Sequence, residues 1–261
     1  MRLEAELRDR RAAGRSLLVP YVTGGLGSGW LDVVRAVADA GADAIEIGIP
    51  FSDPIIDGAT VQEASQRAIE LGATPAKIVA EAAQLDVGVP LLVMTYYNLV
   101  AHAGLERFAA QLADARIDGA IVPDLPLDEL DGWGDAADAA GVETVLLAAP
   151  TTPDDRLRDI CERSRGFVYG VSLLGVTGER AELPRHAAEM GRRLKSTTDK
   201  PVLLGVGIST AEQAVTAARF ADGVIVGSAL VRRVLTGGGG PEEAAGFVAE
   251  LRAALDDARR D

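Results

Sequence analysis

The chain has 261 residues, of which 48% are hydrophobic, and it carries a formal net charge of −13. This length and apolar content fit one large α/β domain or two small ones, and they exclude a disordered chain. The negative charge argues against nucleic acid and against an anionic membrane as the main partner, because both attract basic surfaces. A single cysteine, Cys161, excludes an intramolecular disulfide and a cysteine zinc cluster.

The first 15 residues are charged and have a helical pattern, so we expect an extra helix at the N-terminus. They contain no apolar stretch typical of an export signal, and no run in the chain approaches the roughly 18 apolar residues of a membrane span. We therefore expect a cytoplasmic protein.

Eight short apolar runs follow in chain order, each succeeded by an Ala-rich segment with helical spacing. The runs cover residues 16–23, 43–49, 90–96, 119–123, 143–149, 166–172, 201–207 and 223–228. Strands that are apolar on both faces and joined by helices indicate a parallel sheet, and eight of them indicate a closed (β/α)₈ TIM barrel. We expect one α/β domain over residues 1–261, and an open doubly wound sheet is the alternative fold.

Two connections are longer than the others, and both follow predicted strands. Residues 52–89 contain two further helical patterns, and residues 175–200 begin with the glycine-containing stretch GVTGERAELP. These extended loops, the second and the sixth, would lie at the carboxyl end of the barrel, where chemistry is built. Ser209 is expected to cap the helix that begins with TAEQAV.

Glu46 lies in the middle of an apolar strand within the stretch AIEIGIPFSDPIIDG. Strand alternation places it on the face opposite Ile45 and Ile47, so we expect it to point into the barrel. Burial raises the pKa of a carboxyl group and suits it to exchange a proton near neutrality. A buried ion pair is the alternative, but no predicted strand interior carries Lys or Arg.

Asp57 follows on the loop over the same end of the barrel. A second carboxylate there could hold a hydrogen-bond donor or a developing positive charge while Glu46 exchanges a proton. An ordinary Asp-Gly turn explains the residue equally well.

Glycines near the ends of the seventh and eighth strands predict a phosphate site. Backbone N–H groups at Gly207, Gly227 and Ser228, with the start of the next helix, could bind an anion without a lysine, and Gly178 could complete the site. The alternative is that these glycines only permit tight turns. The two histidines, His102 and His186, have no second ligand nearby, so we expect no metal site.

The ordered motifs resemble those of the tryptophan synthase alpha subunit along almost the whole chain. They are AIEIGIPFSDPIIDGATVQ, PYVTGG, MTYYN, VPDLP, GVTG, GVGIS and VGSALV. The resemblance implies cleavage of indole-3-glycerol phosphate to indole and glyceraldehyde 3-phosphate, without a cofactor. It implies a pyridoxal-phosphate beta subunit as partner, in an alpha2beta2 complex.

The resemblance also implies a role for each matching residue. Glu46 matches the acid that protonates the indole ring carbon, and Asp57 matches the carboxylate that holds the indole N–H. The phosphate cradle is matched by Gly178, Gly207, Gly227 and Ser228. Residues matching the substrate pocket are Tyr21, Met94, Tyr96, Tyr169 and Thr177, the last on the loop that closes over Asp57.

The chain departs from the family pattern at GGLGSG after the first strand, where an acidic turn is usual, and at Ala59, where proline is frequent. Both positions lie near the face where the beta subunit docks in the family. A stand-alone lyase that releases indole for secondary metabolism is therefore an alternative. Two others are a non-catalytic phosphate-binding barrel with an allosteric role, and a related barrel acting on similar precursors.

Overall fold

The computed structural model describes residues 2–171, 183–236 and 240–259. Eight parallel strands lie next to one another in chain order, and β8 pairs with β1 to close the barrel. The strands are β1 (Leu17–Thr23), β2 (Ile45–Gly48), β3 (Leu91–Met94), β4 (Gly119–Ile121), β5 (Glu143–Ala148), β6 (Val168–Val171), β7 (Val202–Gly205) and β8 (Gly223–Val226). Each lies within a predicted strand, so the prediction of a (β/α)₈ barrel is confirmed.

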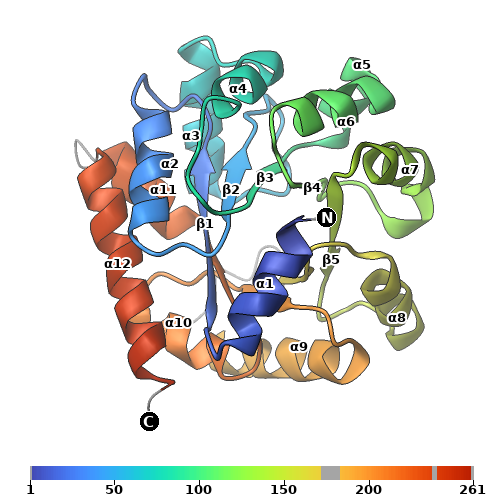
Figure 1. Ribbon diagram of the computed structural model, residues 1–261, viewed down its shortest axis with the longest axis vertical. Coiled ribbons are helices and arrows are strands. Elements are labelled where there is room, and N and C mark those ends of the chain that lie inside the picture. The colour runs from blue at the N-terminus through green and yellow to red at the C-terminus, as the bar shows by residue number, and fades with distance from the viewer. Residues whose placement is uncertain (1, 172–182, 237–239, 260–261) are drawn as a thin grey trace.

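Helices surround the barrel, as Figure 1 shows. They are α1 (Arg2–Ala12), α2 (Trp30–Asp39), α3 (Ala59–Glu70), α4 (Pro75–Ala82), α5 (Tyr97–Ala103), α6 (Leu105–Asp114), α7 (Asp131–Ala140), α8 (Asp154–Arg163), α9 (Leu183–Thr197), α10 (Ala211–Ala218), α11 (Ser228–Thr236) and α12 (Pro241–Asp257), with a short 3-10 helix at Leu127–Glu129. The long second connection contains two helices, α3 and α4, as its sequence predicts.

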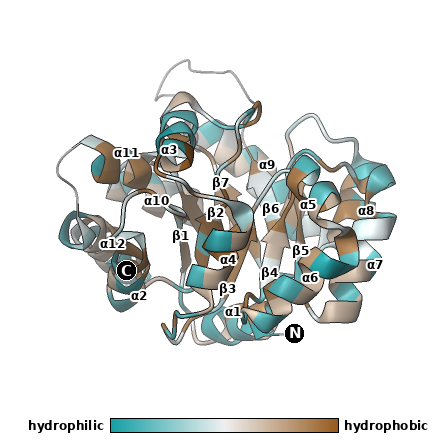
Figure 2. Ribbon diagram, turned by 90° about the horizontal axis from the view of Figure 1, so that it is seen from above, coloured by the Kyte–Doolittle hydropathy of each residue, from teal (hydrophilic) through white to brown (hydrophobic). Residues whose placement is uncertain are grey.

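The strands separate two hydrophobic cores. Inside the barrel, residues from alternate strand positions pack together: Leu17, Val19, Ala44, Leu92, Ile121, Val145, Phe167, Leu203 and Ile225. The outward-facing Ile45, Ile47 and Ile49 pack with the covering helices instead. Figure 2 shows the matching distribution, with hydrophobic residues along the strands and hydrophilic residues on outer faces of helices such as α6. Glu46 therefore points into the barrel, as the alternation predicts.

Helix α1 closes the end of the barrel that is opposite the expected site. Its Leu3 and Leu7 join the inner core, and the helix crosses the barrel in Figure 1. The side chain of Glu143, at the start of β5, accepts the N–H groups of Leu3 at 2.7 Å and Glu4 at 3.0 Å. Because the first N–H groups of a helix lack partners within it, Glu143 caps α1.

One predicted helix start is wrong by a residue. Thr210, not Ser209, caps α10, since its hydroxyl accepts the N–H of Gln213 at 3.3 Å. The N–H and the hydroxyl of Ser209 both bind the side-chain oxygen of Gln213. Gln213 thus bonds to both residues, through its backbone N–H to Thr210 and through its side chain to Ser209. The sequence does not distinguish which of the two adjacent hydroxyl groups caps the helix.

Within the described ranges, no helix combines the length and apolar character that crossing a bilayer demands.

Candidate active site

A cavity of about 670 Å³ opens at the carboxyl ends of the strands. Six of the predicted site residues line it: Asp57, Met94, Tyr169, Gly207, Gly227 and Ser228. Most of the remaining lining is apolar and comes from β4, β5 and the loops that follow them, for example Ile121 and Leu147. Thr177 and Gly178 lie outside the described residues. The cavity therefore brings the acidic residue of the second loop and the glycines after β7 and β8 to one place.

Glu46 lies inside the barrel beside this cavity and is 1% exposed. In strand pairing its neighbours are Tyr21 on β1 and Leu92 on β3. Within the described part of the chain, its Oε2 atom has no hydrogen-bond partner. Burial, and secondly the charge of Asp57, raise the pKa of Glu46 to about 8. This carboxyl group therefore retains its proton at neutral pH and is available as an acid.

Asp57 is held on the loop between β2 and α3. Tyr96 donates a hydrogen bond to its Oδ2 atom at 3.0 Å, and Gln62 donates to its backbone carbonyl at 2.8 Å. Burial raises the pKa of Asp57 to about 6, and the hydrogen bond from Tyr96 acts in the opposite direction. Near neutrality Asp57 is thus ionised while Glu46 is protonated, so the two carboxyl groups are in different protonation states.

Two glycines make room for the phenol rings of the inner barrel. A Cβ atom at Gly48 would collide with the phenol of Tyr21, and one at Gly205 would collide with the ring of Tyr169. Burial raises the pKa of both tyrosines, so their hydroxyls stay protonated. Neither glycine was predicted as part of the site, although each is the inward-facing residue at the end of its strand.

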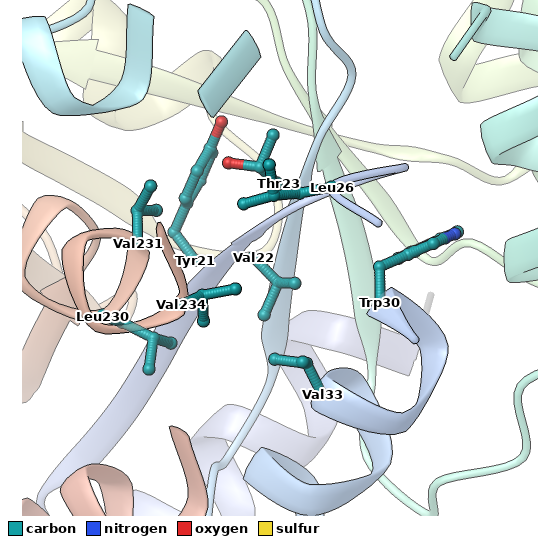
Figure 3. Close-up of a pocket in the computed structure, with 9 residues that line it drawn as sticks. All are labelled: Tyr21, Val22, Thr23, Leu26, Trp30, Val33, Leu230, Val231 and Val234. Carbon is teal, nitrogen blue, oxygen red and sulfur yellow. The ribbon is translucent and has the colours of Figure 1, made fainter. Parts of the chain in front are cut away.

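Tyr21 also borders a second, apolar cavity, which lies between β1, α2 and α11. Figure 3 shows the phenol oxygen of Tyr21 near the hydroxyl of Thr23, while Val22 points to the other side of the strand, toward Val33. This cavity has a volume of only about 10 Å³, about the space of one water. It is too small for a substrate, and the candidate site is the large cavity, which six of the predicted site residues line.

The predicted phosphate cradle lies on the β7–β8 side of the large cavity. Gly207 has φ +77°, a left-handed conformation that other residues rarely adopt, and a Cβ there would meet nothing within 4 Å. The glycine is thus needed for backbone conformation, and the space before it is open. Ser228 is the first residue of α11, and N–H groups at the start of a helix can bind an anion.

Some lining residues were not predicted, and Arg156 is the most polar of them. It lies in the first turn of α8 and forms an ion pair with Asp128 at 2.7 Å. Sequence reasoning could have identified Arg156 because it follows the predicted strand 143–149 closely, and the residues after a barrel strand lie at the carboxyl end of the barrel. Gln62, which holds the Asp57 loop, is the last residue of the motif AIEIGIPFSDPIIDGATVQ, although the motif alone assigns it no role. Over the described ranges, no group of three or more His, Cys, Asp or Glu residues could hold a metal ion.

The fold and this cavity define a (β/α)₈ barrel with two carboxyl groups of raised pKa, Glu46 and Asp57, at the carboxyl ends of its strands. A family model described as "Tryptophan synthase alpha chain" matches residues 7–259. The tryptophan synthase alpha chain of Streptomyces coelicolor is 42% identical over 261 residues, covering 98% of this chain and 95% of that one. The alpha chain of Chloroflexus aggregans is 45% identical over 229 residues, which cover 86% of each chain. A solved structure of tryptophan synthase from Mycobacterium tuberculosis superimposes with a TM-score of 0.90 at 36% identity, covering 97% of this chain and 98% of that one. The chain belongs to the tryptophan synthase alpha chain family.

Proposed function

We propose that the chain cleaves indole-3-glycerol phosphate to indole and glyceraldehyde 3-phosphate, as the alpha subunit of tryptophan synthase in tryptophan biosynthesis. The observation that carries this proposal is a buried carboxyl group inside the barrel, Glu46, that interacts electrostatically with Asp57, which lines the largely apolar cavity. A binding protein would gain nothing from a buried carboxyl group that is costly to ionise. We also propose that residues 1–261 form one domain, because the pairing of β1 with β8 closes a single barrel.

The first half of the reaction needs an acid at a carbon atom and an anion at a nitrogen atom. Glu46 transfers its proton to C3 of the indole ring, which becomes tetrahedral, and positive charge develops at the ring nitrogen. Asp57 accepts a hydrogen bond from that N–H group and stabilises the charge. The effect is strong because the surrounding cavity is mostly apolar and screens charge poorly.

In the second half, the glycerol hydroxyl next to the ring loses its proton and becomes the aldehyde oxygen. The carbon–carbon bond breaks, and its electron pair restores the aromatic indole and neutralises the nitrogen. Glu46, now ionised, is the base that accepts the proton. Glu46 donates one proton to the substrate and takes one back, so the reaction balances without a cofactor.

The phosphate and the ring occupy different parts of the cavity in this proposal. The phosphate lies against the backbone of Gly207, Gly227 and Ser228, where oriented N–H groups bind an anion. The indole lies among Met94, Ile121 and Tyr169, which supply apolar surface. Binding at both ends fixes the reacting carbon near Glu46.

We also propose a cytoplasmic location and a beta-subunit partner in an alpha2beta2 complex. Ile55, on the loop that carries Asp57, is 81% exposed to solvent. A large apolar side chain this exposed beside a catalytic residue is a suitable contact for a partner. Docking there would act directly on the loop that places Asp57.

The proposal is tested by measuring indole release from indole-3-glycerol phosphate by the purified chain. We expect a bell-shaped dependence of kcat/KM on pH, with limbs near 6 for Asp57 and near 8 for Glu46. Glu46→Gln should lower kcat by about 100- to 10,000-fold with little change in KM. The control is Glu63→Gln, which alters an exposed carboxylate on α3 and should behave as wild type. Near-normal turnover by Glu46→Gln would reject Glu46 as the acid, and no indole release by wild type would reject the reaction.

A further inference from the structure

Tyr96 lies between the end of β3 and the start of α5 and is 3% exposed. It is not among the residues that line the described cavity. Its phenol oxygen contacts the loop that carries Asp57, donating to Oδ2 of Asp57 at 3.0 Å and accepting the N–H of Ile56 at 3.2 Å. Because a phenol has one hydrogen, the bond from Ile56 directs that hydrogen toward the carboxylate.

The phenol is fixed at its ring and at its backbone. The ring of Phe51 stacks on it with the centroids 4.9 Å apart and the planes inclined by 28°. Its backbone precedes α5, and the N–H of the next residue, Tyr97, donates to Asp124 at 2.8 Å. The hydroxyl of Tyr96 is therefore placed by contacts on two sides: Phe51, which belongs to the same β2–α3 connection as Asp57, and the backbone at the start of α5.

The loop itself is held separately. Gln62 on α3 donates to the backbone carbonyls of Asp57 at 2.8 Å and Pro54 at 3.3 Å. These bonds fix the path of the loop but do not touch the carboxylate. Of the described contacts to the Asp57 side chain, the one that orients it is the bond from Tyr96.

We propose that Tyr96 is a positioning residue that fixes Oδ2 of Asp57, so that Oδ1 is presented to the N–H group of the substrate. The inference rests on the proposed function, in which Asp57 binds that group. The same hydrogen bond favours the ionised carboxylate and opposes the effect of burial on the pKa of Asp57. Tyr96 thus acts on the reaction only through Asp57.

The other ionisable groups around Asp57 come from different elements. Glu46 on β2, Tyr21 on β1 and Tyr169 on β6 each interact electrostatically with it. Arg156 on α8 lines the same cavity. Substituting Tyr96 alters none of these groups, so a change in the pKa of Asp57 would report on the hydrogen bond.

The decisive variant is Tyr96→Phe, which keeps the ring against Phe51 and removes the oxygen. We expect kcat to fall about tenfold with KM changed less than about twofold, since one bond to a charged group is lost. We expect the acid limb of the pH profile to move to higher pH, because the pKa of Asp57 rises above about 6. Tyr97→Phe removes a phenol oxygen from the adjacent residue and is the matched control.

Two further measurements separate this inference from the proposed function. The pKa of Asp57 can be followed by carboxyl carbon NMR without substrate, the signal being assigned by its loss in Asp57→Asn. It should be higher in Tyr96→Phe than in wild type, whatever the substrate is. In an Asp57→Asn background, Tyr96→Phe should cause no further loss of kcat. An unchanged pKa of Asp57, or a loss of kcat that adds fully to that of Asp57→Asn, would overturn the positioning role.

Discussion

Glu46 illustrates a conflict between stability and chemistry at a single residue. Its side chain is buried, and its Oε2 atom has no partner among the described residues, so ionising it in the folded state is costly. The pKa of Glu46 rises from 4.5 to about 8 on folding. Between these values the folded state holds a proton that the unfolded chain releases, so stability falls as the pH rises through this window. In the proposed reaction, the same burial keeps a proton donor at this position.

A stability measurement can test this account without substrate. We expect Glu46→Gln to unfold at a higher temperature than wild type at pH 9, because the variant has no charge to bury. Each kcal/mol gained would raise the apparent Tm by about 2 to 4 °C. The difference should shrink toward pH 5, where wild-type Glu46 is neutral in the fold. Thermal scans of both proteins and of Glu63→Gln across this pH range are the measurement, and a difference independent of pH would contradict a role for ionisation.

At the scale of elements, helix α1 depends on a residue far away in the sequence. The two N–H groups at its start, from Leu3 and Glu4, bond to the carboxylate of Glu143 on β5. Glu143→Ala would leave these donors without a partner and should destabilise the fold by about 2 to 3 kcal/mol. Urea unfolding measures the loss, and Glu106→Ala, which removes an exposed acid from the first turn of α6, is the control. Activity at low temperature should persist, since α1 lies at the end of the barrel opposite the cavity.

The elements also show what a sequence can predict. Each strand is apolar on both faces and is followed by a helical pattern, so the eight strands and their order can be recognised locally. The inward direction of Glu46 follows from alternation alone. The contacts of Tyr96 with Asp57 and of Glu143 with α1 join residues 39 and up to 140 positions apart. Such pairings depend on how the barrel closes, and no local pattern encodes them.

At the scale of the whole molecule, the two ends of the barrel use carboxylates differently. At the amino end, Asp43 accepts hydrogen bonds from Arg15 at 2.6 Å, Arg10 at 3.0 Å and the N–H of Leu18 at 2.8 Å. Its negative charge is balanced, which stabilises the fold. At the carboxyl end, burial raises the pKa of Glu46 and of Asp57, and the structure gives neither of them an ion pair among the described residues. Structural and chemical roles are thus separated along the barrel axis.

We expect a partner to act at the carboxyl end of the barrel, where Asp57 lies. A beta subunit that binds Ile55 would contact the loop of Asp57 and could favour its active position, to the extent that it prefers that conformation. We expect the free chain to be slow and a saturating beta subunit to raise kcat by about 5- to 150-fold. Ile55→Asp should weaken this response and leave the basal rate unchanged, because Ile55 does not line the described cavity.

The control for this substitution is Ala139→Asp, which places the same charge on an exposed position of α7, away from the loop (Figure 1). Titrating each variant with beta subunit while following indole release gives both affinity and maximal activation. A loss of affinity confined to Ile55→Asp would support docking on the Asp57 loop, while equal losses in both variants would indicate a nonspecific effect of charge. High turnover by the free chain, with no response to beta subunit, would favour the stand-alone lyase. In that case, GGLGSG and Ala59 would mark a docking face that no longer binds a partner.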